Sequence, residues 1–99
     1  MKTQITPTSV RTTDVFGALG FPPQEAANLR IRSTMMTALT KHIKASHLTQ
    51  AQAAKLLGVT QPRISALMQG KIYLFSIDNL VSLLSTAGLD VKVRIKTAA

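Results

Sequence analysis

The segment from Leu48 to Gly70 constrains the fold more than any other part of this chain, because it predicts two short helices in close succession. Thr49 and Gln52 form a capping box, in which each side chain satisfies a free backbone N–H of the other residue and so starts a helix. Gly58 ends that helix at the position that favours a left-handed backbone. The residues expected to face inward are Ala53, Ala54 and Leu57. The two alanines are small enough to let a second helix cross closely.

The second predicted helix begins after a turn of only three residues. Thr60 can cap its first turn, and Pro62 fits there because that turn needs no backbone N–H from it. Ile64 and Leu67 are expected to face the core, and Gly70 ends the helix. Two short helices joined by such a turn are the helix-turn-helix plan, whose second helix enters the major groove of DNA.

The polar side chains of this second helix distinguish a DNA-binding motif from a helical corner in any bundle. Four of its residues are expected to stay exposed: Gln61, Arg63, Ala66 and Gln69. Arginine pairs with guanine, glutamine pairs with adenine, and a small methyl group packs against thymine. We therefore favour contacts to base edges over a purely structural corner.

The charge of the chain is strongly positive. Twelve Lys and Arg residues against four Asp and Glu residues give a net charge of +8. Between Ala26 and Ile77 there is no acidic residue, and the basic residues are Arg30, Arg32, Lys41, Lys44, Lys55, Arg63 and Lys71. A field of one sign is typical of proteins that bind nucleic acid, an anionic membrane or an acidic protein. The alternative, that these residues only keep a small domain soluble, stays open.

Several classes of protein are excluded by what the 99 residues lack. Without cysteine there is no disulfide framework, zinc ribbon or thiol nucleophile, and the composition is compatible with a reducing cytosol, where we expect the protein to act. No uncharged apolar run approaches ~18 residues and no apolar stretch follows Lys2, so neither a membrane span nor a secretory signal is expected. We expect no cofactor and no enzymatic activity, since paired carboxylates, a glycine-rich phosphate loop and a nucleophile–base set are missing.

Two other kinds of site are not favoured. His42 and His47 lie five residues apart at a predicted helix end with no third ligand nearby, so two surface histidines are favoured over a metal site. RNA-binding proteins usually stack bases on exposed aromatic side chains. This chain has only four aromatic residues, Phe16, Phe21, Tyr73 and Phe75, and Phe75 is expected to be buried.

The remaining segments complete a small domain. Residues 1–22 are expected to form a loose arm and one helical turn that docks on the core, and residues 23–99 form the DNA-binding domain with a C-terminal dimerisation strand. Over residues 24–46 an apolar residue recurs every four positions, which predicts a long helix with Ile31, Met35, Leu39 and Ile43 inward. Ser76 is the expected N-cap of a last helix over residues 77–87.

Residues 90–96 predict a β-strand, because apolar and charged residues alternate there. The apolar positions are Val91, Val93 and Ile95. A single strand in a helical chain has unpaired backbone groups, so it must pair with residues 3–12, with a second copy or with another protein. We favour an antiparallel pair of identical strands, which makes these three residues the seam of a homodimer.

The motif resembles the Xre/Cro-type helix-turn-helix of phage repressors. The residues that carry the resemblance are Thr49-Gln50, Ala54, Leu57-Gly58, Thr60-Gln61, Ile64-Ser65 and Gly70. Over Asp14 to Ile95, the order of the segments is also similar to the Xre-family antitoxins of HigA type. The resemblance implies a mainly α, lambda-repressor-like helical bundle with a helix-turn-helix and a C-terminal β-strand.

The resemblance also implies a function. It implies a homodimer that binds a palindromic operator in double-stranded DNA and represses its own promoter, and a partner toxin, a RelE-like ribonuclease. Residues matched to base contacts are Gln61, Arg63, Ala66 and Gln69, and those matched to phosphate contacts are Thr49, Gln50, Thr60 and Lys71. Such toxins are commonly basic, so a chain of charge +8 would hold one through apolar and β-strand contacts. The alternative is a solitary phage- or host-type regulator of the same fold, without a toxin.

Overall fold

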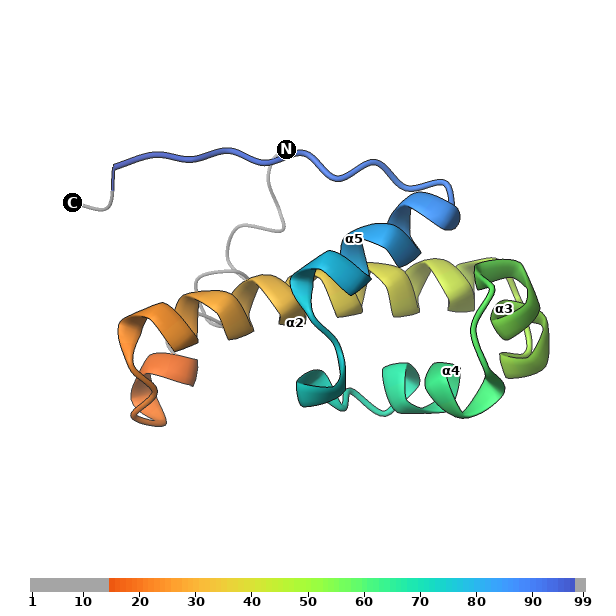
Figure 1. Cartoon of the computed structure of the whole chain (residues 1–99), viewed down its shortest axis with the longest axis horizontal. Coiled ribbons are helices and arrows are strands. Elements are labelled where there is room, and N and C mark those ends of the chain that lie inside the picture. Colours follow the sequence, from red (N-terminus) through yellow and green to blue (C-terminus); the bar gives the residue numbers. More distant parts are fainter. Residues whose placement is uncertain (1–14, 98–99) are drawn as a thin grey trace.

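A long helix is the axis of the molecule, and three shorter helices pack along it (Figure 1). The computed structural model describes residues 15–97. Helix α2 spans Pro23–Ala45, so the bounds of the predicted long helix are confirmed to within one residue at each end. Met35, Leu39 and Ile43 are buried as predicted, but the prediction that Ile31 faces inward is wrong, because it is 47% exposed and Leu29 is buried in this part of the helix instead. The helix begins with proline at its first position, where no N–H is needed, and carries Glu25 in its first turn, near the positive end of the helix dipole. It ends at Ser46, and the next residue, His47, has a positive φ of 57°.

The two motif helices begin and end where the sequence predicts. Helix α3 spans Gln50–Leu57, and its capping box is complete: Gln52 N donates to Thr49 Oγ1 over 3.1 Å, and Thr49 N donates to Gln52 Oε1 over 2.9 Å. Gly58 follows in the left-handed conformation with φ 71°. Helix α4 spans Gln61–Met68, and the hydroxyl of Thr60 caps it by accepting from the backbone N–H of Arg63. These local bonds orient α4 relative to α3.

A short 3₁₀ turn and a last helix close the bundle. The turn, η1, spans Ile72–Leu74, and helix α5 spans Ile77–Thr86. The Ser76 hydroxyl caps α5 by accepting from Asn79 N over 3.0 Å, as predicted. Figure 1 shows η1 and α4 on the same side of α2, with α5 on the other side. The segment that follows η1 therefore crosses α2 before α5 begins.

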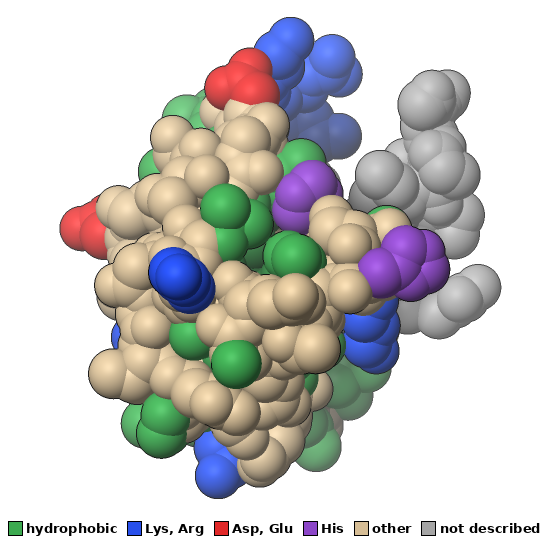
Figure 2. All heavy atoms as spheres, turned by 90° about the vertical axis from the view of Figure 1, so that its right-hand side faces the viewer, with side chains coloured by type: hydrophobic (Ala, Val, Ile, Leu, Met, Phe, Trp, Pro, Cys, Tyr) green, Lys and Arg blue, Asp and Glu red, His purple; other side chains and the backbone are tan. Residues whose placement is uncertain are grey.

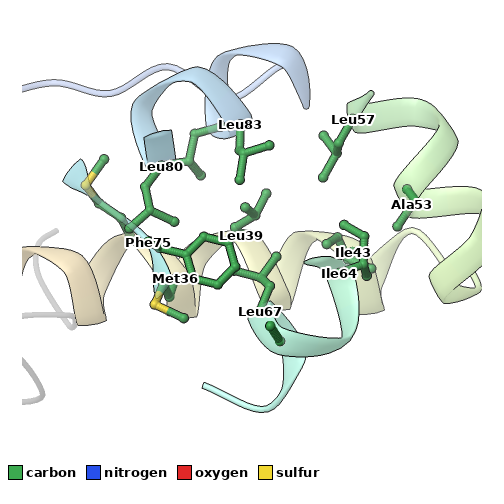
Figure 3. Packing of buried hydrophobic residues seen from close by; sticks show 14 residues of the cluster. Met36, Leu39, Ile43, Ala53, Leu57, Ile64, Leu67, Phe75, Leu80 and Leu83 are labelled. Atoms are coloured by element: carbon green, nitrogen blue, oxygen red, sulfur yellow. The ribbon is translucent and has the colours of Figure 1, made fainter. Parts of the chain in front are cut away.

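The main core lies where α2, α3, α4 and α5 converge (Figure 3). Its fully buried large side chains include Leu39, Ile64, Leu67, Phe75 and Leu80. Figure 3 shows the ring of Phe75 among side chains from α2, α4 and α5. Burying one such side chain is worth about 1.5–3 kcal/mol, so the ring contributes substantially to holding the three helices together. Within residues 15–97 no polar or charged residue is buried, so the core is entirely apolar.

The N-terminal turn lies apart from this main core. Residues 15–18 form the predicted helical turn, and the rings of Phe16 and Phe21 meet edge to face with their centroids 6.3 Å apart. Leu19, however, is 69% exposed. The main core begins at Met35, which lies twelve residues, or about 18 Å, along α2 from the end that the turn adjoins. The turn therefore does not reach the core on which the sequence predicts it to dock. The predicted arm lies outside the described residues.

The predicted C-terminal strand is not formed. After α5, residues 90–97 run without regular secondary structure, and the described part of the chain is helical with no strand. Val91 is half-buried against the main core, but Val93 and Ile95 are 78% and 90% exposed. A strand needs a partner for its backbone hydrogen bonds, and residues 15–97 offer none. The alternation of apolar and charged residues indicates a segment that is able to form a strand, but it does not show which other segment would pair with it.

No helix among the described residues is long and apolar enough to span a bilayer.

Candidate nucleic-acid interface

One side of α4 presents a row of polar side chains. At about 100° per residue, positions four apart lie above one another on a helix, which places Gln61, Ser65 and Gln69 in one stripe. Both glutamines are exposed, Ser65 is half-buried, and Gln69 Nε2 donates to Ser65 Oγ over 2.9 Å. The sequence predicts the two glutamines as base contacts but does not predict Ser65. The spacing of four residues from each glutamine was the signal that could have found it.

Ala66 does not belong to this stripe. The sequence predicts it as an exposed methyl group for thymine, and that prediction of exposure is wrong, because the residue is 8% exposed and part of the main core. Ala66 lies on the inward-facing part of α4 together with Ile64 and Leu67. After the helix the chain turns at Gly70, which has φ 73°, and the backbone N–H of Lys71 donates to the Ala66 carbonyl oxygen over 3.1 Å.

Arg63 points to a different side of α4 from the two glutamines. It lies two residues from Ser65, which is about 160° around the helix. Its guanidinium carbon lies 4.1 Å from the centroid of the Phe75 ring, and its Nη2 donates to Asn79 Oδ1 over 2.7 Å. The structure thus separates Arg63 from the other predicted base contacts and connects it to α5. Sequence periodicity could not reveal this, because both partners lie beyond the motif.

The predicted phosphate contacts lie around the beginnings and the end of the motif helices. Thr49, Gln50 and Thr60 are exposed at the starts of α3 and α4, and Lys71 is exposed just after α4. The first backbone N–H groups of a helix are not used inside it and bind phosphate readily. The two threonine hydroxyls accept from backbone N–H groups, so each retains its own O–H for another acceptor.

The positive charge is distributed rather than collected into one patch on the end of the molecule that carries α3. Figure 2 shows single Lys and Arg side chains separated by uncharged surface over most of this face, and one group of basic side chains beside an acidic one at the top edge of the view. A surface of this kind suits individual contacts to separate phosphates better than a single large anion.

Comparison with known proteins agrees with this geometry. A family model described as a helix-turn-helix domain matches residues 18–96. This chain belongs to that helix-turn-helix family. The helix-turn-helix protein is also similar to a solved structure assigned to the XRE family of transcriptional regulators, with 34% sequence identity and a TM-score of 0.70. The similarity covers 75% of this chain and 83% of that chain. No curated protein sequence matches this helix-turn-helix protein.

Both findings identify an Xre-type helix-turn-helix protein with the fold of a DNA-binding transcriptional regulator. The family match includes all of α2 to α5 and most of the extended segment after α5. Membership of the helix-turn-helix family therefore applies to the whole domain, and is not limited to the motif formed by α3 and α4.

Proposed function

We propose that this Xre-type protein is a sequence-specific repressor that binds a palindromic operator as a homodimer, with α4 in the major groove. The observation that carries the proposal is the exposed polar stripe of α4, with Gln61 in the first turn of the helix. In helix-turn-helix proteins the beginning of the second helix makes the contacts to base edges. The capped ends of α3 and α4 hold this stripe in a fixed orientation.

Within the stripe, Gln61 and Gln69 are the proposed base contacts, because a glutamine amide can pair with both edge groups of adenine. We add Ser65, whose hydroxyl can donate or accept. Ala66 is left out because it is buried. Arg63 would have to leave Phe75 and Asn79 to reach a base, so it is left out as well. The proposed phosphate contacts remain Thr49, Gln50, Thr60 and Lys71.

The dimer is proposed to form through the extended segment after α5. Two recognition helices must lie about 34 Å apart to enter successive major grooves, which requires a fixed two-fold seam. In residues 90–97 the exposed Val93 and Ile95 and the unpaired backbone are available for an antiparallel pair with a second copy. Val91 already packs against the core and would anchor the pair. The alternating basic residues would remain in solvent and limit further pairing.

The finer proposal is that the protein is the antitoxin of a type II toxin–antitoxin pair, which represses its own operon and neutralises a RelE-like toxin. Its support is the resemblance to HigA-type antitoxins. The alternative is a solitary Xre regulator of phage or host type. Co-expression with the product of the neighbouring small reading frame, followed by co-purification, separates the two: a stable complex supports the antitoxin, and its absence supports the solitary regulator.

DNA binding is tested with a duplex taken from upstream of the protein's own reading frame and a shuffled duplex of the same length. We expect the protein to bind the first duplex more tightly than the second. We also expect log K to fall linearly with log [salt], with a slope of several units, because each neutralised phosphate contributes about 0.9 to the slope. Gln61→Ala should reduce the preference by about 1–3 kcal/mol. Gln24→Ala, an exposed glutamine at the start of α2, is the matched control and should leave it unchanged. Equal binding to both duplexes with a flat salt response would exclude this function.

The proposed seam is tested with Val93→Pro, which removes a backbone donor and blocks pairing of the segment. Sedimentation should then show a monomer. Circular dichroism should show normal helix content, and the affinity for the operator should be lower. A variant that stays dimeric would place the seam elsewhere in the protein.

A further inference from the structure

A hollow that the proposed function does not use lies beside α4. It has a volume of about 650 Å³ and is shallow and open to solvent. Its walls come from α2, α4, the η1 turn and the beginning of α5, and two of the residues that line it are Arg32 and Arg63. None of the described residues that line it is acidic. Two cations from different helices therefore share a space that contains no carboxylate to neutralise them.

Arg32 is held in place from three directions. Its Nε donates to Asn28 Oδ1 over 2.7 Å, one turn earlier in α2. Its Nη1 donates to the carbonyl oxygens of Ile72 and Phe75 over 3.2 and 3.3 Å. Its guanidinium carbon also lies 5.9 Å from the centroid of the Tyr73 ring, within the range of a cation–π contact. The side chain has thus already lost its conformational freedom when the protein folds.

Arg63 approaches from α4 and is held in a similar way. The Phe75 ring and the Asn79 amide oxygen orient its guanidinium, as described above. Together the two guanidinium groups have ten N–H donors, of which four have an acceptor in the part of the chain that the structure describes. Planar guanidinium groups with unused donors bind the oxygens of a phosphate in pairs, with shorter and stronger bonds than neutral donors make.

We propose that this hollow, formed around Arg32 and Arg63, binds a phosphodiester of the DNA backbone. The proposal rests on the proposed function and adds a contact from α2, which lies outside the motif. Figure 1 shows η1 beside α4 on the same side of α2, and the hollow flanks α4 on the side of Arg63 rather than on the side of Gln61. Tyr73, on η1 and 65% exposed, lines the hollow.

The openness of the hollow favours the DNA backbone over a small anionic molecule. Small-molecule sites usually enclose most of their ligand. A backbone phosphate instead needs only a surface that presents donors to its two free oxygens, because the rest of the nucleotide stays in the duplex. A charge of +8 also attracts a polyanion over a long distance.

The test is the salt dependence of DNA binding by Arg32→Gln, measured by fluorescence anisotropy on the upstream duplex and on its shuffled form. We expect about tenfold weaker binding to both duplexes and a slope of log K against log [salt] that is smaller by about 0.9. Arg30→Gln removes the same charge from the same helix, outside the hollow, and should leave the slope unchanged. Arg32→Lys should keep the slope, because the charge remains, but should weaken binding, because the paired geometry is lost.

The variants must melt like the parent protein for this comparison to hold, and a thermal melt of each checks it. A second measurement does not depend on folding of a variant: single methylphosphonate substitutions along the duplex remove one phosphate charge at a time. At one position the substitution should weaken DNA binding by the parent protein but should not weaken binding by the Arg32→Gln variant any further. If Arg32→Gln keeps the full slope, or if Arg30→Gln loses as much, the proposal is overturned while the function of α4 stands.

A small phosphate-containing anion could bind the same hollow in place of the DNA backbone, and binding of inorganic phosphate and pyrophosphate to the protein tests for it. Saturable binding of pyrophosphate that raises the melting temperature of the parent but not of Arg32→Gln, with no change in the DNA slope, would identify a site for a small anion and overturn the DNA contact. Failure of the parent protein to bind any duplex would instead refute the proposed function itself.

Discussion

Replacing Gly58 by alanine tests whether the turn between α3 and α4 depends on a left-handed backbone. Gly58 has φ 71° and ψ 30°, and a Cβ placed there would meet no heavy atom within 4 Å. The whole cost must therefore come from the backbone. A left-handed conformation costs an L-residue about 1–2 kcal/mol. Alanine loses less chain entropy than glycine on folding, which returns about 0.5–1 kcal/mol. We expect the free energy of unfolding to fall by about 1 kcal/mol.

The assay is thermal unfolding followed by circular dichroism. For a domain of this size, 1 kcal/mol corresponds to a decrease in Tm of about 4–8 °C. Gly17→Ala is the matched control, because Gly17 lies in the N-terminal helical turn, has no positive φ and also leaves open space for a Cβ. Its Tm should stay the same or rise slightly. An unchanged Tm for Gly58→Ala, or an equal loss in Gly17→Ala, would refute the backbone argument.

Three further changes test the local structure by thermal melting. His47→Gly should raise the free energy of unfolding by about 0.5–1 kcal/mol, because the histidine holds a positive φ of 57° that glycine adopts without cost; a lower Tm would contradict this. Thr49→Ala should lower it by about 0.5–2 kcal/mol through loss of the capping box, and an unchanged Tm would mean that solvent replaces the cap. Ala54→Leu should lower it by about 1–3 kcal/mol, because three extra carbons cannot enter the packed core around this 6% exposed residue, and native-like melting would show that the core can expand there.

The helices and their ends could be predicted from the sequence because their causes are local. Thr49, Thr60 and Ser76 each bond to a backbone N–H three residues ahead, and Gly58 supplies the one conformation that the turn requires. In the long helix the buried Met35, Leu39 and Ile43 follow one another every four residues, so its second half too is visible without knowledge of its neighbours. The glutamines of α4 followed from the same reasoning, because helical spacing places Gln61 and Gln69 in one stripe that does not include the buried Ile64 and Leu67.

The rest of the site depends on contacts between segments that are distant in the sequence. Arg63 looks like a base contact from its position in the motif, and only the packing of Phe75 and Asn79 reveals that it is directed to α5. Ala66 is buried because α4 packs against the other helices of the main core, which the motif alone does not show. The predicted strand required a mate that residues 15–97 do not provide. No motif includes Arg32, so the sequence does not predict it as a ligand group, and it comes to line the same hollow as Arg63 only because η1 packs beside it.

The entirely apolar core has a practical consequence for the biochemistry of this protein. Since no charged residue is buried within residues 15–97, concentrated salt has little inside the fold to screen, and salting-out ions strengthen apolar packing. We expect the proposed contacts to phosphate to behave in the opposite way and to weaken steeply as salt is added. Nucleic acid that accompanies the protein during purification can therefore be removed with a high-salt wash that leaves the protein folded. In a salt titration, loss of a DNA complex then measures the interface alone.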